Sequence, residues 1–539
     1  MLRFTVEAAI ALAMAVTLFR AFFAEGYMIS TGSMAPSLLG YHRQVCCPAC
    51  EFRFARGAAT EADSHGGTAT ASSDDRLLDE TASVTARCPL CGTAVSEQHV
   101  PRTEGDQLMV HKHHYDWCDP ERWEVVVFRN PQLPTQAYVK RVVGLPGETI
   151  ELRDGDVYVD EVLQRKPLAV QRALRVPIDD STYQPAADDP DWQPRWQAES
   201  SDSLWRTDGR QFRFHTPKKQ TGAATIDWVH YRHWVRAGGR HLSRVPLADW
   251  PDEIAQPGQY AHGFRYDAEA HELEAVGAIP DRVRSEWCER VGRPDVRRAL
   301  DNLYRASHQP LLSDVCAYNH PDSASVAYPV HDLMLELDLT AHARRGTLDF
   351  VLNDGCHELV GQLDLEAGVA RILADDKPTI HREGPLPDEL LNGEPVLLTV
   401  SQFDRQFIVA INEQPLFEPL LYAAEGRRAV LPEHPVKFGA QAADVTLSNI
   451  RLDRDIYYTQ LDAQERTVCS LGSDEFFMLG DNSPVSLDSR AWEHPAVPRA
   501  LLIGRPFVVH LPSKPRTIRW GDRELVLRVP DFSRVRYIR

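Results

Sequence analysis

Residues 121–162 read ERWEVVVFRNPQLPTQAYVKRVVGLPGETIELRDGDVYVDEV, and this stretch decides the fold of the central part of the chain. It contains four short apolar runs that are rich in β-branched residues, at 125–128, 138–143, 149–152 and 157–159. The dipeptides Pro146-Gly147 and Asp154-Gly155 are typical of turns and separate the later runs. The pattern predicts consecutive strands joined by turns, and therefore a mainly β fold.

Length and charge limit the function classes. The chain has 539 residues, enough for three to four domains of about 150 residues each. Apolar residues make up 43% and charged residues 25%, which argues against global disorder and against a polytopic membrane protein. The net charge is -18. We expect no nucleic-acid partner, because binding to phosphates needs basic residues.

The N-terminus contains an apolar segment. Residues 8–19 (AAIALAMAVTLF) carry no charge, and the apolar stretch resumes after Arg20. With its flanks, the segment has about the 20 residues that are needed to cross a bilayer. A cleavable secretory signal is the alternative, because the apolar core is short. We favour an uncleaved anchor over residues 1–26, since the basic region before it is weak. Arg3 against Glu25 favours an orientation with the bulk of the chain outside the cytoplasm.

Three stretches contain candidate catalytic residues. In STGSMAPSLL (30–39), Ser33 follows a glycine that permits a turn; it is either a nucleophile or an ordinary turn residue. Lys140 lies in the predicted strand at 138–143 and either faces water or has a pKa lowered by burial, so that it can act as a base. In GDNSPVSLDSR (480–490), Asp488 and Arg490 are placed to form a charge-assisted pair.

In this order after a single apolar segment, these stretches resemble bacterial type I signal peptidase, the membrane-bound Ser/Lys leader peptidase. The resemblance covers about residues 20–39, 105–168 and 476–509, well under half of the chain. It implies a signal-peptidase-type antiparallel β core with one N-terminal transmembrane helix, in the bacterial inner membrane, with the catalytic domain on the extracytoplasmic side. The implied substrates are signal peptides of exported preproteins, and the implied partners are membrane lipid and the secretion machinery.

Position by position, the resemblance implies that Ser33 is the nucleophile and Lys140 the general base. Thr31 matches a hydroxyl position that helps the Ser33 backbone N–H to form the oxyanion hole, and Ser486 matches the serine that orients the lysine. The residues that match the loop holding the site together are Asp481, Asp488 and Arg490. Val485 departs from the family, whose members often have asparagine there. No cofactor is expected for catalysis.

Four cysteines form two C-P-x-C knuckles: Cys47, Cys50, Cys88 and Cys91. Four thiolates at this spacing suit a structural tetrahedral zinc ion and leave no open position for catalysis. Disulfides are the alternative, because an extracytoplasmic compartment is oxidising. The stretch between the knuckles is longer than the common ribbon spacing of about 15–20 residues. Because the four cysteines nevertheless have the local spacing of zinc knuckles, we predict a zinc-ribbon-like insertion at 46–91.

A large insertion spans roughly residues 165–454. Residues 329–454 alternate between apolar and polar at short regular spacing, which predicts an antiparallel β-sandwich. This part resembles concanavalin-like, laminin-G-type jelly rolls. Residues 165–328 are unassigned apart from a predicted helix at 280–307, and the core comprises 27–45, 92–164 and 455–539. Because every implied catalytic residue lies outside the insertion, we expect it to stand beside the core without contributing to the active site.

Two functions follow from the sequence. The first is that of a membrane-bound signal peptidase I, a serine endopeptidase that cleaves signal peptides from exported preproteins. The alternative is a membrane-anchored binding protein that displays the β-sandwich on an inactive protease scaffold. The presence of Ser33, Lys140, Thr31 and Ser486 together favours the enzyme.

Overall fold

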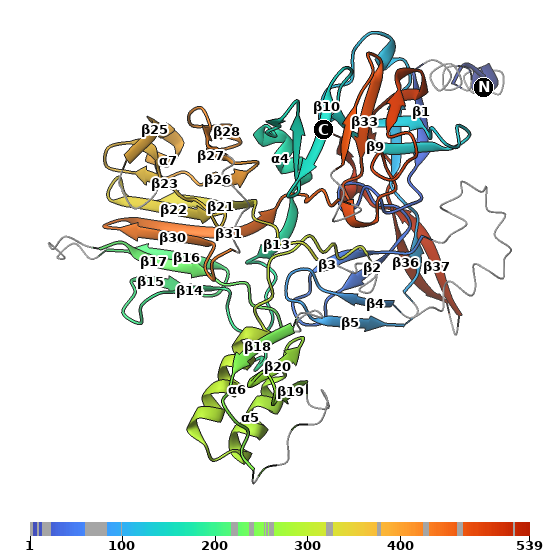
Figure 1. Ribbon diagram of the computed structural model, residues 1–539. Coiled ribbons are helices and arrows are strands. Elements are labelled where there is room, and N and C mark those ends of the chain that lie inside the picture. Colours follow the sequence, from blue (N-terminus) through green and yellow to red (C-terminus); the bar gives the residue numbers. More distant parts are fainter. Residues whose placement is uncertain are drawn as a thin grey trace.

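Strands dominate the structure, a computed structural model of the chain (Figure 1), and the predicted mainly β fold class is confirmed. The residues that the structure describes are 4–7, 10–12, 14, 23–59, 84–98, 100–216, 225–236, 242–252, 254, 257, 263–319, 327–374, 379–423, 431–460, 467–520 and 523–538. The membrane span predicted over residues 1–26 lies largely outside them. Within the described residues, no helix is both long and apolar enough to cross a bilayer.

An antiparallel sheet of eight strands, here called the core sheet, lies on one side of the molecule (Figure 1). Its order is β1-β7-β35-β8-β9-β33-β34, with β38 paired to β35. The strands are β1 (Ala24–Met28), β7 (Gln107–His111), β8 (Val125–Arg129), β9 (Ala137–Gly144), β33 (Glu475–Leu479), β34 (Ala496–Pro498), β35 (Leu502–Val509) and β38 (Arg536–Tyr537). Four consecutive residues of β8 are buried, as expected of a strand covered on both faces. The predicted runs at 125–128 and 138–143 therefore form neighbouring strands.

A smaller sheet of four strands packs against the core sheet. Its order is β12-β11-β10-β32. The strands are β10 (Thr149–Arg153), β11 (Asp156–Val159), β12 (Val162–Leu163) and β32 (Val468–Ser470). Asp154 and Gly155 both have positive φ, 49° and 87°, which fits a two-residue hairpin between β10 and β11. The chain leaves this sheet after β12 and returns to it at β32, so the large insertion begins and ends at one sheet.

The insertion contains a β-sandwich of two antiparallel sheets. The first sheet contains β13 (Val176–Asp180), β15 (Trp205–Thr207), β16 (Gln211–His215), β21 (Leu333–Ala341), β26 (Val396–Phe403), β27 (Gln406–Ile411), β28 (Gln414–Pro415), β29 (Leu420–Leu421) and β31 (Asp444–Arg454). The second contains β14 (Trp196–Ala198), β17 (Asp227–Tyr231), β22 (Thr347–Asn353), β23 (Glu358–Asp364), β24 (Val369–Ala374), β25 (Thr379–Pro385) and β30 (Val436–Gln441). Two short helices pack against the sandwich, α4 (Leu168–Leu174) and α7 (Asp388–Leu391).

The sandwich extends beyond the predicted range of 329–454, because strands from 176–231 lie in both sheets. Strands β13 and β16 pair with β31, and β17 pairs with β30. Five aromatic side chains of residues 176–231 are buried with Phe438 in the core of the sandwich: Trp196, Trp205, Phe212, Phe214 and Tyr231. Two of the strands in this range, β14 and β15, have only three residues, so their alternation was too short to be recognised in the sequence.

The two cysteine knuckles lie at the turns of two hairpins, which we call the knuckle unit. Its strands are β2 (His42–Cys46), β3 (Arg53–Gly57), β4 (Val84–Arg87), β5 (Ala94–Glu97) and β6 (Arg102–Thr103). The knuckle unit shares one hydrophobic core with a helical unit of the insertion. The helical unit contains β18 (Leu242–Pro246), β19 (Phe264–Asp267), β20 (Glu272–Val276), α5 (Asp281–Arg290) and α6 (Pro294–Ser307). The knuckles are therefore attached to the insertion as well as to the core.

The single helix predicted at 280–307 is wrong, because two helices occupy this range. The first ends at Arg290 and the second begins at Pro294, so residues 291–293 break the helix. A proline has no N–H for an interior helical bond but is well suited to the first turn of a helix. The remaining elements are η1 (His114–Asp116), η2 (Ser483–Val485), η3 (Arg499–Leu501), η4 (Phe532–Arg534), β36 (Ser513–Trp520) and β37 (Arg523–Pro530).

A buried ion cluster joins the two ends of the insertion. The amine of Lys166, just before α4, contacts carboxylate oxygens of Asp404 and Asp455, the latter at 2.7 Å. The backbone N–H of Lys166 also donates to Asp404 at 2.9 Å. Asp404 lies in the β26–β27 turn and Asp455 follows β31, so this one amine links three distant segments. Burial alone would lower the pKa of Lys166, but the two carboxylates outweigh burial and raise it.

We expect Lys166→Met to destabilise the insertion, because two buried carboxylates would lose their cation. Removing one partner of a buried ion pair typically costs about 3–5 kcal/mol. The free energy of unfolding of the full chain, measured in urea, should fall by that amount. The control is Lys437→Met, since Lys437 pairs with Glu358 at 3.0 Å on the sandwich surface, where a pair contributes at most about 1 kcal/mol. Equal losses for the two variants would contradict this role of Lys166.

Candidate active site

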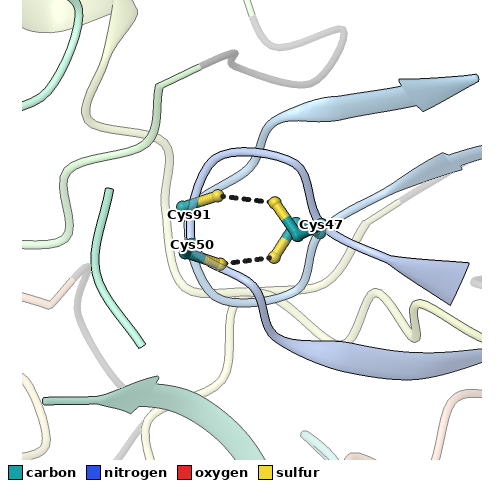
Figure 2. A group of neighbouring side chains, drawn as sticks. Cys47, Cys50 and Cys91 are labelled. Atoms are coloured by element: carbon teal, nitrogen blue, oxygen red, sulfur yellow. Dashed lines mark hydrogen bonds between the residues drawn. The ribbon is translucent and has the colours of Figure 1, made fainter. Parts of the chain in front are cut away.

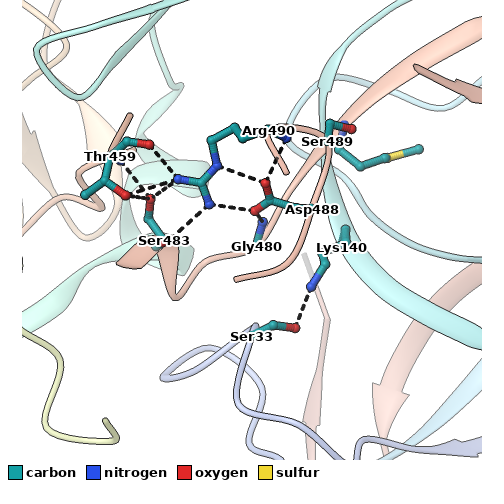
Figure 3. Close-up of polar contacts among 9 residues, drawn as sticks. Ser33, Lys140, Thr459, Gly480, Ser483, Asp488, Ser489 and Arg490 are labelled. Carbon is teal, nitrogen blue, oxygen red and sulfur yellow. Dashed lines mark hydrogen bonds and ion pairs between the residues drawn. The ribbon is translucent and has the colours of Figure 1, made fainter. Parts of the chain in front are cut away.

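The side chains of Ser33 and Lys140 contact each other where the loop after β1 packs against β9. Ser33 lies in the loop that follows β1, here called the serine loop (residues 31–37), and Lys140 lies in the middle of β9. The Lys140 Nζ is 2.6 Å from the Ser33 Oγ, within hydrogen-bond distance (Figure 3). Only 3% of the Lys140 surface is exposed. The sequence left open whether Lys140 faces water or is buried. The structure shows that it is buried.

The surroundings of Lys140 favour its neutral form. Burial lowers the pKa of Lys140 to about 8, because an ammonium ion loses its hydration there. The carboxylate of Asp488 opposes this shift, the guanidinium of Arg490 adds to it, and the carboxylate of Asp481 opposes it. At pH 7 about one tenth of the amine is therefore unprotonated, with a lone pair available beside a serine hydroxyl.

The loop at 480–490 takes part in two buried ion pairs, one within the loop and one with strand β9. Arg490 and Asp488 lie 2.7 Å apart with both side chains fully buried, as the sequence predicted (Figure 3). Arg490 also donates to Ser483, and the N–H of Gly480 donates to Asp488 at 3.0 Å. Asp481 instead accepts two hydrogen bonds from Arg141 of β9, at 2.9 and 2.8 Å. These bonds fix the loop against the strand that carries Lys140.

Sequence reasoning missed Arg141, although it directly follows Lys140. Its side chain is 2% exposed, and it also donates to the carbonyl of Trp123. In a strand, adjacent residues point to opposite faces, so a strand with a buried lysine and a buried arginine must be covered on both sides. The sequence did contain a signal for this burial, because the adjacent basic residues Lys140 and Arg141 lie within an otherwise apolar run.

Ser486 packs against the serine loop, and Thr31 is the first residue of that loop. Ser486 Oγ packs against Gly480: a Cβ atom at residue 480 would lie 2.1 Å from Ser486 Oγ and 2.5 Å from the carbonyl oxygen of Ser33. Among the described residues, Ser486 Oγ has no hydrogen-bond partner although it is buried. Thr31 precedes Ser33 by two residues, and its carbonyl packs against Gly40. Glycine at 480 thus permits the close approach of the two loops.

Asn482, to which sequence reasoning gave no role, binds the serine loop directly. Its backbone N–H donates to the carbonyl of Ser33 at 3.0 Å, and its side-chain Nδ2 donates to the carbonyl of Gly32 at 2.9 Å. The same amide exchanges hydrogen bonds with Asn319, a residue of the large insertion. The expectation that the insertion stands apart from the candidate site is therefore wrong. The sequence offered no signal for Asn319, because it lies more than 150 residues from any candidate catalytic residue.

The four knuckle cysteines converge on one point. Their side chains are buried, and their four sulfur atoms all lie within 4.8 Å of one another. The Sγ atoms of Cys47 and Cys91 are 3.5 Å apart (Figure 2). Those of Cys50 and Cys88 are also 3.5 Å apart. Four thiolates around one zinc ion at about 2.3 Å would place their sulfurs about 3.8 Å apart. The donor set and its spacing therefore fit a tetrahedral zinc ion.

Comparison with known proteins agrees with this geometry. The family described as "Signal peptidase, peptidase S26" matches residues 96–205 and 403–511. "Probable signal peptidase I-1" of Synechocystis sp. is 35% identical over 96 residues, which cover 15% of this chain and 49% of the relative. "Signal peptidase I V" of Bacillus subtilis is 39% identical over 57 residues, covering 11% of this chain and 33% of the relative. The chain thus spans about half the length or less of these curated relatives.

The fold and the Ser33–Lys140 pair define a β-sheet protein in which a buried lysine amine lies beside a serine hydroxyl, an arrangement that suits a serine peptidase. The matches are more specific: parts of the chain are similar to the family described as signal peptidase, peptidase S26. The first matched segment includes Lys140 but starts after Ser33. Among solved structures, the carbohydrate-binding module CBM66 of Bacillus subtilis covers 23% of this chain and 75% of its own chain, with 12% identity and a TM-score of 0.18. A score this low adds nothing to the description of the sandwich.

The lowered pKa can be measured by NMR titration of the full chain with isotopically labelled lysines. We expect Lys140 to titrate near pH 8, against about 10.4 for an exposed lysine. In Asp488→Asn the midpoint should move lower still, because the carboxylate that favours the ammonium form is gone while Arg490 stays. Asp474→Asn is the control, since Asp474 is exposed and pairs with Arg499. A midpoint near pH 10 in the unmodified chain would contradict the site description.

Proposed function

We propose that the protein is a membrane-bound signal peptidase I, a serine endopeptidase that cleaves signal peptides from exported preproteins. The observation that carries the proposal is the 2.6 Å contact between the Lys140 amine and the Ser33 hydroxyl, in a site that lowers the pKa of Lys140 to about 8. The alternative, a binding protein on an inactive scaffold, is not favoured, because an inactive scaffold has no need of a buried, partly neutral lysine beside a serine.

In the proposed mechanism, the neutral amine of Lys140 takes the proton of the Ser33 hydroxyl as its oxygen attacks the scissile carbonyl carbon. The backbone N–H of Ser33 and the hydroxyl of Thr31 stabilise the charge that develops on the carbonyl oxygen. The proton then passes from Lys140 to the leaving amine, and the carbon–nitrogen bond breaks. In the second half, Lys140 takes a proton from water as the water oxygen attacks the acyl ester, and it returns this proton to the Ser33 oxygen as the ester C–O bond breaks.

The remaining candidate residues act as supports in this proposal. Asp488 and Arg490 form a buried pair whose opposite charges largely cancel, so burial decides the protonation of Lys140. Asp481 binds Arg141 and so fixes the 480–490 loop against β9. Ser486, buried without a hydrogen-bond partner among the described residues, is free to orient the lysine amine when substrate binds.

The substrate would bind in an extended form. Strand β1 ends the core sheet, and within the described strands it pairs with β7 alone. A signal peptide could add alongside β1 and the start of β9, a mode in which main-chain hydrogen bonds read the substrate backbone. We further propose that residues 1–26 anchor the protein in the bacterial inner membrane with this site on the extracytoplasmic side, in contact with lipid and with the secretion machinery.

We also propose that Cys47, Cys50, Cys88 and Cys91 hold one structural zinc ion. Four thiolates complete a tetrahedral shell, so this zinc would stabilise the fold and take no part in the reaction. The surrounding core joins the knuckle unit to the helical unit of the insertion. The ion would therefore stabilise the contact between these two units.

We expect Ser33→Ala and Lys140→Ala each to abolish preprotein cleavage by the detergent-solubilised protein, and the double variant to be no worse, because nucleophile and base act as a unit. In the unmodified enzyme, kcat/KM should rise about tenfold per pH unit below pH 8 and then level off, since only the neutral amine acts as a base. Lys437→Ala on the sandwich surface is the control. Near-normal turnover of Lys140→Ala, or a flat profile down to about pH 5, would refute the assignment.

Elemental analysis of the full chain should find one zinc per molecule. The variant with Cys88→Ser and Cys91→Ser should lose the metal and melt at a lower temperature, because metal binding contributes to folding. Cys118→Ser is the matched control, since Cys118 is exposed and lies outside the knuckles. If no zinc is found and mass spectrometry shows disulfides among the four cysteines, the oxidised form replaces the zinc site.

A further inference from the structure

One segment of the large insertion reaches the serine loop. Tyr318 and Asn319 lie between α6 and β21, and Tyr318 is buried. The Tyr318 ring covers Gly32, the residue before Ser33, so closely that a Cβ atom at residue 32 would lie 2.0 Å from the ring. The same ring covers Gly57 of β3, where a Cβ atom would lie 2.6 Å away. Two glycines from separate parts of the chain thus make room for one aromatic ring.

Three hydrogen bonds from the region around β2 and β3 hold Tyr318 in place. Its hydroxyl donates to the carbonyl of Tyr41 at 2.8 Å. Its own carbonyl accepts from the N–H of Gly57 at 2.8 Å and from the Arg56 guanidinium at 2.7 Å. The ring position is therefore fixed from both ends of the residue, and the knuckle unit supplies most of the bonds.

Asn319 completes the contact through Asn482. The two side-chain amides exchange hydrogen bonds: Asn319 Nδ2 donates to Asn482 Oδ1 at 2.8 Å, and Asn482 Nδ2 donates to Asn319 Oδ1 at 2.6 Å. The same Asn482 Nδ2 donates to the carbonyl of Gly32 at 2.9 Å. Asn319 therefore sets the orientation of the amide that binds the serine loop.

The Gly32 carbonyl and the Ser33 N–H belong to one planar peptide group and point in opposite directions. A bond that fixes the Gly32 carbonyl therefore also fixes the direction of the Ser33 N–H. That N–H is the proposed oxyanion donor. Donors aimed in advance at the developing charge contribute most of their stabilisation in the transition state.

We infer that Tyr318 and Asn319 of the insertion are positioning residues, which orient the Gly32–Ser33 peptide through the covering ring and through Asn482. This inference rests on the proposed function. Neither residue touches the reacting atoms, and both act through the serine loop. The insertion thus completes the active site, and this peptidase depends on a segment far from its catalytic residues in sequence.

The test is the steady-state cleavage of a signal-peptide substrate by the full-length, detergent-solubilised protein at a temperature well below the melting point of every variant. For Asn319→Ala and Tyr318→Ala we expect kcat to fall about 10- to 100-fold, the size of effect expected from a small misplacement of catalytic groups. KM should change less than about twofold, and the pH midpoint should stay near 8, because the surroundings of Lys140 are unchanged. Tyr318→Phe keeps the ring and should retain most of kcat.

The control variant is Asn392→Ala, at the exposed end of α7 in the sandwich, which should leave kcat unchanged. If the unmodified protein does not cleave, or if Ser33→Ala still cleaves, the proposed function fails. If cleavage depends on Ser33 but both alanine variants keep normal kcat, the inference alone is refuted. A rise in KM with unchanged kcat would also overturn it, because substrate binding and not the alignment of the serine loop would then be affected.

Discussion

A buried amine within hydrogen-bond distance of a serine hydroxyl imposes the main constraint on this structure. The Lys140 amine can stay partly neutral only if water is excluded and the neighbouring charges balance. Strand β9 meets the first condition by lying between β8 and β33 of the core sheet. The Asp488–Arg490 pair meets the second, because its opposite charges are buried together next to the lysine. Arg141 and Asp481 then fix the loop that carries this pair, so each of the two buried guanidinium groups has a buried carboxylate partner.

The large insertion of nearly three hundred residues leaves the core sheet intact, because both of its ends lie at the four-stranded sheet. The two ends are also joined by the ammonium group of Lys166. Lys166, Asp404 and Asp455 close the insertion at its base. A second attachment is made at Tyr318 and Asn319, which reach the serine loop. The knuckle unit shares its core with the helical unit, which adds a further contact between core and insertion. The insertion is therefore held at several separate points and cannot move as a loosely tethered domain.

The core strands and the meeting of Ser33 with Lys140 were predictable, because long β-branched runs and turn dipeptides mark strands and the local motifs resemble a known family. The knuckle cysteines were predictable for a similar reason, since their spacing is local. The contacts of Arg141 and Asn319 were not predictable, because their partners are 340 and 163 residues away in the sequence, respectively. The strands at 176–231 escaped prediction because they are short and gain their stability from partners such as β30 and β31. Pro294 did carry a local signal for the break between α5 and α6.

The interleaved strand order of the sandwich determines how the chain can be divided. A fragment of residues 329–454 would contain β30 and β31 but lack β13, β16 and β17, which pair with them. Each sheet would then expose a row of unpaired N–H and C=O groups beside a stripe of buried apolar residues, the features that lead strands of separate molecules to associate. The smallest unit that keeps both these strand pairs and the Lys166, Asp404 and Asp455 cluster is consequently residues 166–455, with the helical unit retained inside it. Any search for ligands of the sandwich should start from that unit.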